Sequence, residues 1–174
     1  MELFTNKMPQ RVIDLARAVN AHSLLPSAFY DISRSTFSLI FESSPSLSLA
    51  DTQKLALGKE ASHVAVTNLI TTLASGRCTS KSISPGKSCH SPVSCRKDFS
   101  ELVELATQHY LFDRERGSTD PLYVADELGQ LKSAEFSECK ACAYALEHWS
   151  ARERERIWKS IPTWFRLDGW DCCS

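Results

Sequence analysis

The chain has 174 residues, of which 43% are hydrophobic and 24% are charged, and its formal net charge at pH 7 is −1. These values are typical of a globular protein with a core of ordinary size, and they exclude disorder of the whole chain. The nearly neutral charge also excludes a global electrostatic attraction to nucleic acid or to an anionic membrane, although it leaves room for a local basic patch.

The sequence contains no run close to the roughly 18 apolar residues that a membrane-spanning helix needs. Its first residues, MELFTNK, have an acid at the second position and no apolar stretch, so we expect no signal peptide. We therefore expect an intracellular protein, cytoplasmic or nuclear, without membrane partners. In a reducing compartment the seven cysteines are interpreted as thiols or metal ligands rather than as a disulfide framework.

Helical periodicity begins near the N-terminus. Residues 10–22 are predicted as a helix, because apolar residues recur at the spacing of one helix face. That face is formed by Val12, Leu15, Ala16 and Val19. Pro26 suits the first turn of a second helix, which we expect to reach about Arg34.

A longer helix is predicted after the capping-box-like residues 48–51, and we expect it to run to about Leu73. Gly58 lies inside this stretch, where glycine costs about 1 kcal/mol relative to alanine. The glycine therefore predicts a kink or a break between two helices. The preceding residues 41–45 are predicted as a loop because they contain serines and a proline.

Residues 75–96 differ in composition from both flanks, since they are rich in Ser, Pro, Gly and Lys and poor in large apolar groups. Such a stretch buries too little surface to offset its ordering entropy, which predicts an exposed and partly disordered linker. We expect it to be held in place near Cys89 and Cys95.

The C-terminal part again has helical periodicity. One helix is predicted from Ser94 or Asp98 to about Leu111, and Asp120 is expected to cap a second helix that ends near Leu131. A long helix follows over about residues 134–160. Further along the chain, Pro162 is expected to restart a short helical turn that ends at Gly169.

The sequence has no convincing two-residue alternation, so the predicted fold is all-α. We expect two helical lobes, residues 1–74 and residues 97–174, joined by the flexible linker of residues 75–96 and ending in one long helix.

Several short motifs occur in the order found in one known family. RVIDLAR at residues 11–17, followed by LLPSAFYD at residues 24–31, resembles the helix pair just after the BTB/POZ domain of fungal BTB-domain proteins. LSLAD at residues 47–51 with LGKE at residues 57–60 is similar to the next element of that region.

The C-terminal motifs extend the resemblance. CKAC at residues 139–142, IWKSIPTWF at residues 157–165 and Trp170 resemble the end of the same post-BTB region. The resemblance implies a BACK-like helical region that positions or binds other proteins, as part of a ubiquitin-ligase or transcription-related adaptor. We expect the BTB domain itself to be missing, so dimerisation or cullin docking through that domain is not expected for this chain.

Two cysteine pairs are candidate metal ligands. Cys139 and Cys142 are spaced to place both sulfurs on one side of a helix start, which suits half of a zinc tetrahedron. Cys89 and Cys95 are the candidates for the other half, with His90 as a substitute ligand. The alternative is that Cys139 and Cys142 are small core residues. A redox Cys-x-x-Cys site is disfavoured because no strands are predicted.

The charged run at residues 152–156 alternates in sign and is interpreted as a solvated helix face. A nucleic-acid surface that includes Lys159 and Arg166 is the alternative, but interleaved acids oppose phosphate binding, so a nucleic-acid partner is not expected. Among the aromatic residues, Trp149, Trp158 and Phe165 are expected to pack inward. The predicted interaction surface consists of Trp164, Trp170 and Arg166.

The sequence has no Gly-rich phosphate loop, no nucleophile elbow and no His-Glu-x-x-His helix. We therefore do not expect an enzyme. The first hypothesis is a non-catalytic protein-interaction module with an unknown protein partner. The alternative is a zinc-stabilised nucleic-acid-binding or regulatory module.

Overall fold

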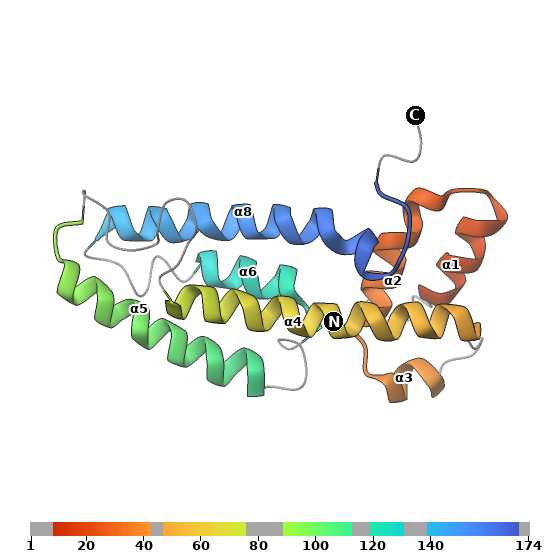
Figure 1. The fold of residues 1–174 in the computed structure, drawn as a ribbon, viewed down its shortest axis with the longest axis horizontal. Coiled ribbons are helices and arrows are strands. Elements are labelled where there is room, and N and C mark those ends of the chain that lie inside the picture. Colours follow the sequence, from red (N-terminus) through yellow and green to blue (C-terminus); the bar gives the residue numbers. More distant parts are fainter. Residues whose placement is uncertain (1–8, 43–46, 76–88, 113–118, 131–138, 171–174) are drawn as a thin grey trace, which may run out of the picture. The chain divides into compact units, whose positions relative to one another are not determined.

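The computed structural model describes residues 9–42, 47–75, 89–112, 119–130 and 139–170. Within these ranges the chain forms helices and turns without any strand, so the all-α prediction is confirmed (Figure 1). The elements in chain order are α1 Pro9–Ala18, η1 His22–Leu24 (a 3-10 turn), α2 Leu25–Ser33, α3 Phe37–Glu42, α4 Leu49–Ser75, α5 Pro92–Ala106, η2 Thr107–Leu111 (a π-helical turn), α6 Pro121–Gln130 and α8 Lys140–Trp164.

The chain divides into two compact units. The first unit combines Met1–Ala61 with Lys159–Ser174, and the second unit is Ser62–Trp158. These limits differ from the predicted lobes, because α4 and α8 each contribute to both units. The predicted linker is wrong at its C-terminal end, since α5 begins at Pro92; residues 76–88 of that linker lie outside the described ranges.

In the first unit α1 packs against α2 through a face that differs from the predicted one. Of the four residues of the predicted face, Ala16 is buried at 1% exposure, whereas Val12, Leu15 and Val19 are 42%, 62% and 61% exposed. Ile13, which the prediction left out, is buried at 1%. The prediction was wrong because these two apolar stripes lie next to each other on the helix surface. Periodicity alone does not decide which of them the neighbouring helix covers.

The core of the first unit contains an aromatic pair. Phe29 of α2 and Phe165, just after α8, are both fully buried, and their ring centroids are 5.5 Å apart. The Phe165 ring also lies on Gly58 of α4, where a Cβ atom would overlap it. The predicted break between two helices at Gly58 is therefore wrong: α4 is one helix from Leu49 to Ser75, and the glycine makes room for the ring.

The capping residues that the sequence predicted for the starts of α4 and α6 are confirmed. The Asp51 amide donates a hydrogen bond of 3.1 Å to the Ser48 hydroxyl, which in turn donates one of 2.7 Å to the Asp51 carboxylate. At α6 the Tyr123 amide donates to the Asp120 carboxylate at 3.0 Å. Short α3, by contrast, was missed, because its residues were assigned to a loop or left unassigned.

Two helices end in the same way. After α1, Asn20 has a left-handed φ of 57°, and the amides of Asn20 and Ala21 donate to carbonyls of the last turn at 3.1 and 2.7 Å. After α8, Arg166 has a φ of 51°, and the amides of Arg166 and Leu167 donate to carbonyls at 3.2 and 2.9 Å. Both are Schellman motifs. Pro162 lies inside α8, so its predicted role in restarting a helix is wrong.

Polar contacts fix the N-terminal half of α4 within the first unit. Arg17 of α1 forms a two-pronged ion pair with Asp51, with N···O distances of 2.8 and 2.5 Å. The buried Lys59 ammonium donates to the carbonyls of Ser33 and Ser35 at 2.7 and 2.6 Å, close to the end of α2. A cation favours the C-terminal end of a helix, where carbonyl groups lack partners.

The second unit is built on α6 and the middle of α8. Leu128 and Leu146 are fully buried, and Trp149 is 2% exposed, as predicted for this tryptophan. The Ser150 hydroxyl donates a hydrogen bond to the Ala125 carbonyl of α6. Trp158 is 43% exposed, so the prediction that it packs inward is wrong.

Candidate metal centre

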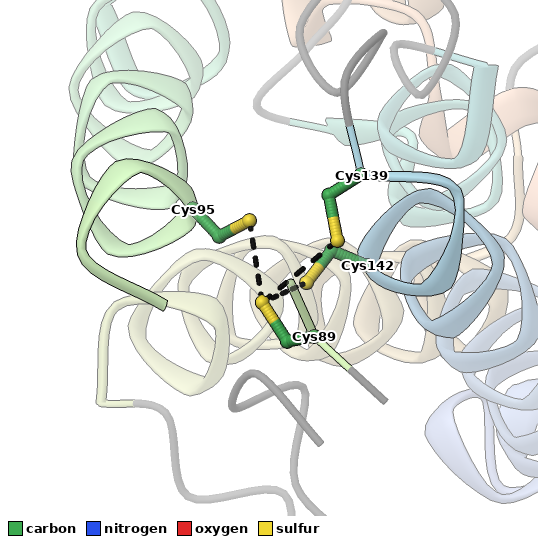
Figure 2. A group of neighbouring side chains, drawn as sticks. All are labelled: Cys89, Cys95, Cys139 and Cys142. Atoms are coloured by element: carbon green, nitrogen blue, oxygen red, sulfur yellow. Dashed lines mark hydrogen bonds between the residues drawn. The ribbon is translucent and has the colours of Figure 1, made fainter. Parts of the chain in front are cut away.

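Four cysteines from two helix starts meet in the second unit, and we call them the cysteine cluster (Figure 2): Cys89, Cys95, Cys139 and Cys142. Cys89 lies before α5 and Cys95 in its first turn, which Pro92 begins and in which the Cys95 amide donates to the Ser91 carbonyl at 2.9 Å.

Cys139 and Cys142 occupy the start of α8. The Cys139 carbonyl accepts hydrogen bonds of 3.1 Å from the amides of Cys142 and Ala143, which closes the first turn of the helix. This turn places both sulfurs on the side that faces Cys89, as Figure 2 shows. The spacing Cys-x-x-Cys at a helix start therefore brings the two sulfurs to one side of α8, as the sequence predicted.

The sulfur atoms of the cluster are packed around a common centre. The Cys89 Sγ lies 3.5 Å from that of Cys95, 3.8 Å from that of Cys139 and 3.7 Å from that of Cys142. All four sulfurs lie within 4.8 Å of one another. A tetrahedron with metal–sulfur bonds of about 2.3 Å places its sulfurs about 3.8 Å apart, so the geometry matches a four-thiolate site.

The cluster is mostly shielded from solvent. Cys95 is 1% exposed and Cys139 and Cys142 are each 3% exposed, while Cys89 is half-buried. Burial alone is also expected of cysteines that serve as core residues. What distinguishes this arrangement from isolated core cysteines is that four sulfurs lie within 4.8 Å of one another.

The surroundings of the cluster shift the pKa values of its thiols in opposite directions. Backbone amides, first that of Cys142 and then that of His90, lower the pKa of the Cys139 thiol from 9.0 to about 6 despite its burial. Burial raises the pKa of Cys95 to about 11 and also raises the pKa of Cys142. These opposite shifts make Cys139 a more acidic thiol than Cys95 or Cys142.

The predicted interaction residues lie elsewhere. Trp164 and Trp170 are half-buried and Arg166 is exposed, all in the C-terminal part of the first unit. None of these three residues is a member of the cysteine cluster. His90, the predicted substitute ligand, is exposed, and it is not one of the four clustered ligands.

The charged run of α8 is paired with acids. Arg154 contacts Asp126 of α6 at 2.5 Å, and Arg156 contacts Glu153 at 2.7 Å. Both arginines are about half exposed, with side-chain exposures of 51% and 54%. These ion pairs agree with the interpretation of residues 152–156 as a solvated helix face.

Comparisons with protein-family models, with curated proteins and with solved structures find no match to this chain. The assignment of a role therefore rests on the residues and their geometry. In the described ranges no helix has the length and apolar character that crossing a bilayer requires.

Proposed function

We propose that this chain is a non-catalytic helical interaction module whose second unit is held together by one structural zinc ion on Cys89, Cys95, Cys139 and Cys142. The observation that carries the proposal is the convergence of four sulfurs at separations of 3.5 to 3.8 Å around Cys89.

The donor set favours zinc and a structural role. Thiolates are soft ligands, which select Zn²⁺ over Mg²⁺ or Ca²⁺. Catalytic zinc sites keep one position open for water or substrate, whereas four protein thiolates fill the tetrahedron. The ion would fasten Cys89 to Cys139, 50 residues further along the chain, and would thereby join the start of α5 to the start of α8.

An interaction role is supported by an uncovered apolar stripe on α1. Val12, Leu15 and Val19 follow one another at helical spacing, yet they are 42%, 62% and 61% exposed. A stripe of this kind costs free energy in water and is the usual feature of a surface that another protein covers. It belongs to the first unit, whereas the four proposed zinc ligands belong to the second.

The resemblance to the post-BTB region of fungal BTB proteins gives this module a context. We propose that the chain is a BACK-like region that positions a partner protein. The contact between Gly58 and Phe165 supports the proposal, because these residues belong to two of the motifs on which the resemblance rests, LGKE and IWKSIPTWF. A nucleic-acid-binding role is disfavoured, because Arg154 and Arg156 are already paired with acids.

The zinc proposal is tested by metal content. Protein purified under reducing conditions should contain about one zinc ion per chain by native mass spectrometry and elemental analysis. Replacement by Co²⁺ should give the sulfur-to-cobalt charge-transfer bands and the intense visible bands of a tetrahedral thiolate site.

Two substitutions make this experiment specific. Cys142→Ser should lose the metal and the cobalt spectrum, whereas Cys78→Ser, which changes a cysteine outside the described ranges, should keep both. Wild-type protein that is reduced, folded and supplied with Zn²⁺ but retains none would refute the zinc centre.

The interaction role is tested separately by a photo-crosslinking amino acid placed at Leu15. In fungal cells it should capture discrete proteins, and the substitutions Val12→Ser and Val19→Ser should abolish that capture without unfolding the chain. The same amino acid at Ala56, an exposed position of α4, serves as the matched control. Equal crosslinking from both positions would argue against a binding stripe on α1.

A further inference from the structure

A second candidate site lies in the first unit and shares no residue with the cysteine cluster. It is a cavity of about 220 Å³ between the end of α1, the beginning of α4 and the segment that follows α8. Its lining residues are Arg17, His22, Ser23, Leu25, Lys54, Arg166, Leu167, Asp168 and Gly169. Most of its polar side chains are basic.

We propose that this cavity binds a small phosphate, either inorganic phosphate or a small phosphate monoester. Cations reach it from three separate segments, with Arg17 on α1, Lys54 on α4 and Arg166 after α8. A tetrahedral phosphoryl group presents oxygens in several directions and therefore suits donors that converge from several sides. A carboxylate presents only two oxygens in one plane.

The charges around the cavity leave an excess of positive charge. Arg17 is already paired with Asp51, but two of its guanidinium nitrogens carry that pair, and the side chain keeps 39% exposure with further N–H donors. Within the described ranges neither Lys54 nor Arg166 takes part in an ion pair. Asp168 is the one acid that lines the cavity, so the two unpaired cations outweigh it.

The backbone at Arg166 is a second, independent observation. Its φ of 51° is in the left-handed region at the C′ position of a Schellman motif, which glycine or asparagine usually occupies. An arginine adopts this conformation with strain that a glycine would avoid. Such strain is typical of functional positions, and here it holds a guanidinium group at the rim of a cationic cavity.

The size of the cavity limits the ligand. Drug-sized ligands occupy pockets of roughly 300–1,000 Å³, so about 220 Å³ suits a smaller molecule. The cavity is large enough for a phosphoryl group with a short organic substituent. Buried Leu25 and half-buried Leu167 provide apolar contacts for such a substituent.

The test is a titration of the full-length chain with inorganic phosphate at constant ionic strength, followed by calorimetry and by backbone amide NMR shifts. We expect a dissociation constant on the order of millimolar or tighter. The shifted amides should cluster around residues 20–25 and 165–169. Glycerol 3-phosphate should bind at least as well as phosphate, whereas glycerol and chloride should not bind.

Three variants separate binding from folding. Arg166→Gly relieves the left-handed strain, so it should keep or raise the unfolding temperature while weakening phosphate binding about tenfold. Asp168→Asn removes the acid from the cavity and should tighten binding. Arg11→Gln, an exposed residue of α1 outside the cavity, should change neither property.

The proposal is overturned if phosphate does not bind, if the shifted amides lie elsewhere, or if Arg166→Gly binds phosphate as the wild type does. The measurement does not depend on zinc, because no lining residue belongs to the cysteine cluster. Loss of metal with retained phosphate binding would therefore separate this proposal from that of the structural zinc.

Discussion

The ring of Phe165 lies directly on the backbone of Gly58, so that the glycine of α4 forms the floor of the pocket for this aromatic side chain. The ring also packs with Phe29, with a centroid separation of 5.5 Å. A glycine that is unfavourable for an isolated helix is therefore required by a contact that forms only in the folded unit.

This contact makes Gly58→Ala a destabilising substitution, although alanine favours helix. The helical gain is about 1 kcal/mol, while forcing a methyl group into a filled site costs typically 1–3 kcal/mol or more. We expect a net loss of about 1–2 kcal/mol in the free energy of unfolding, measured by urea denaturation.

Two further variants check the cause. Gly169→Ala should change stability by less than about 0.5 kcal/mol, because nothing lies within 4 Å of a Cβ atom built there. Phe165→Leu should recover part of the loss when it is combined with Gly58→Ala. A Gly58→Ala variant more stable than the wild type would show that the ring does not occupy this position.

The Arg17–Asp51 pair predicts a loss of stability in acid. The hydrogen bond from Arg17 lowers the pKa of Asp51 below its ordinary value of 3.8, against the effect of burial. Between the folded-state pKa of Asp51 and its ordinary value, the unfolded chain therefore binds more protons than the folded chain. The stabilisation by this pair is present above about pH 4 and is lost as the pH falls through the folded-state pKa.

We expect this contribution to be about 1 kcal/mol, because the Arg17 side chain is 39% exposed and solvent screening weakens the ion pair. Urea denaturation from about pH 5 to about pH 3 should show a steeper loss in the wild type than in Asp51→Asn. Asp31→Asn changes an exposed acid with a looser 3.8 Å ion pair and should keep the wild-type profile. Parallel profiles for all three proteins would contradict the prediction.

Lys59 should be costly to replace even by a side chain of similar length. Its ammonium group supplies donors to the carbonyls of Ser33 and Ser35 and lies 5.0 Å from the centre of the Phe37 ring. Burial lowers the pKa of this lysine, so these contacts compensate for the desolvation of a charge.

Lys59→Met leaves both carbonyls without these donors, and we expect a loss of about 1–3 kcal/mol in thermal or urea unfolding. Lys97→Met removes an exposed lysine from α5 and should cost less than about 0.5 kcal/mol. An unchanged stability of Lys59→Met would show that the ammonium group contributes no net free energy at this position.

If the cysteine cluster holds zinc as proposed, removal of that ion should loosen the starts of α5 and α8. After treatment with a zinc chelator under reducing conditions, amides in the first turns of α5 and α8 should exchange with solvent at least about tenfold faster, because zinc binding contributes folding free energy there. Amides near Phe29 in the first unit should change less. Identical exchange before and after metal removal would contradict a structural role.

Local signals in the sequence predicted the local features of the fold. The hydroxyl and carboxylate groups of Ser48 and Asp120 identified two helix starts, because capping depends on residues within a single turn. The prediction of the buried face of α1 was partly wrong. Ile13 and Val12 are both apolar, and packing against the neighbouring helix, which the sequence does not show, determines which of the two is buried. The break expected at Gly58 is absent for a related reason: Phe165, whose ring occupies the space that the glycine leaves, is distant in the sequence.

The two candidate sites also differ in how far they could be predicted from the sequence. Cys139 and Cys142 carry a recognisable spacing, and Cys89 and Cys95 form the other closely spaced pair that precedes them, so the four cysteines of the cluster could be named although Cys95 was assigned to a linker. The cationic cavity was not predicted. Its residues come from three separate segments, and only Arg166 had been singled out in the sequence.

The half-buried position of Cys89 has a kinetic consequence for the proposed centre. The Cys89 sulfur lies within 3.8 Å of each of the other three, and Cys89 is the least shielded of the four residues. An incoming chelator or metal-donating thiol would reach the ion by displacing this ligand, while the three buried sulfurs hold it in place. The accessibility of one side chain would therefore set the exchange rate of the metal, independently of its affinity.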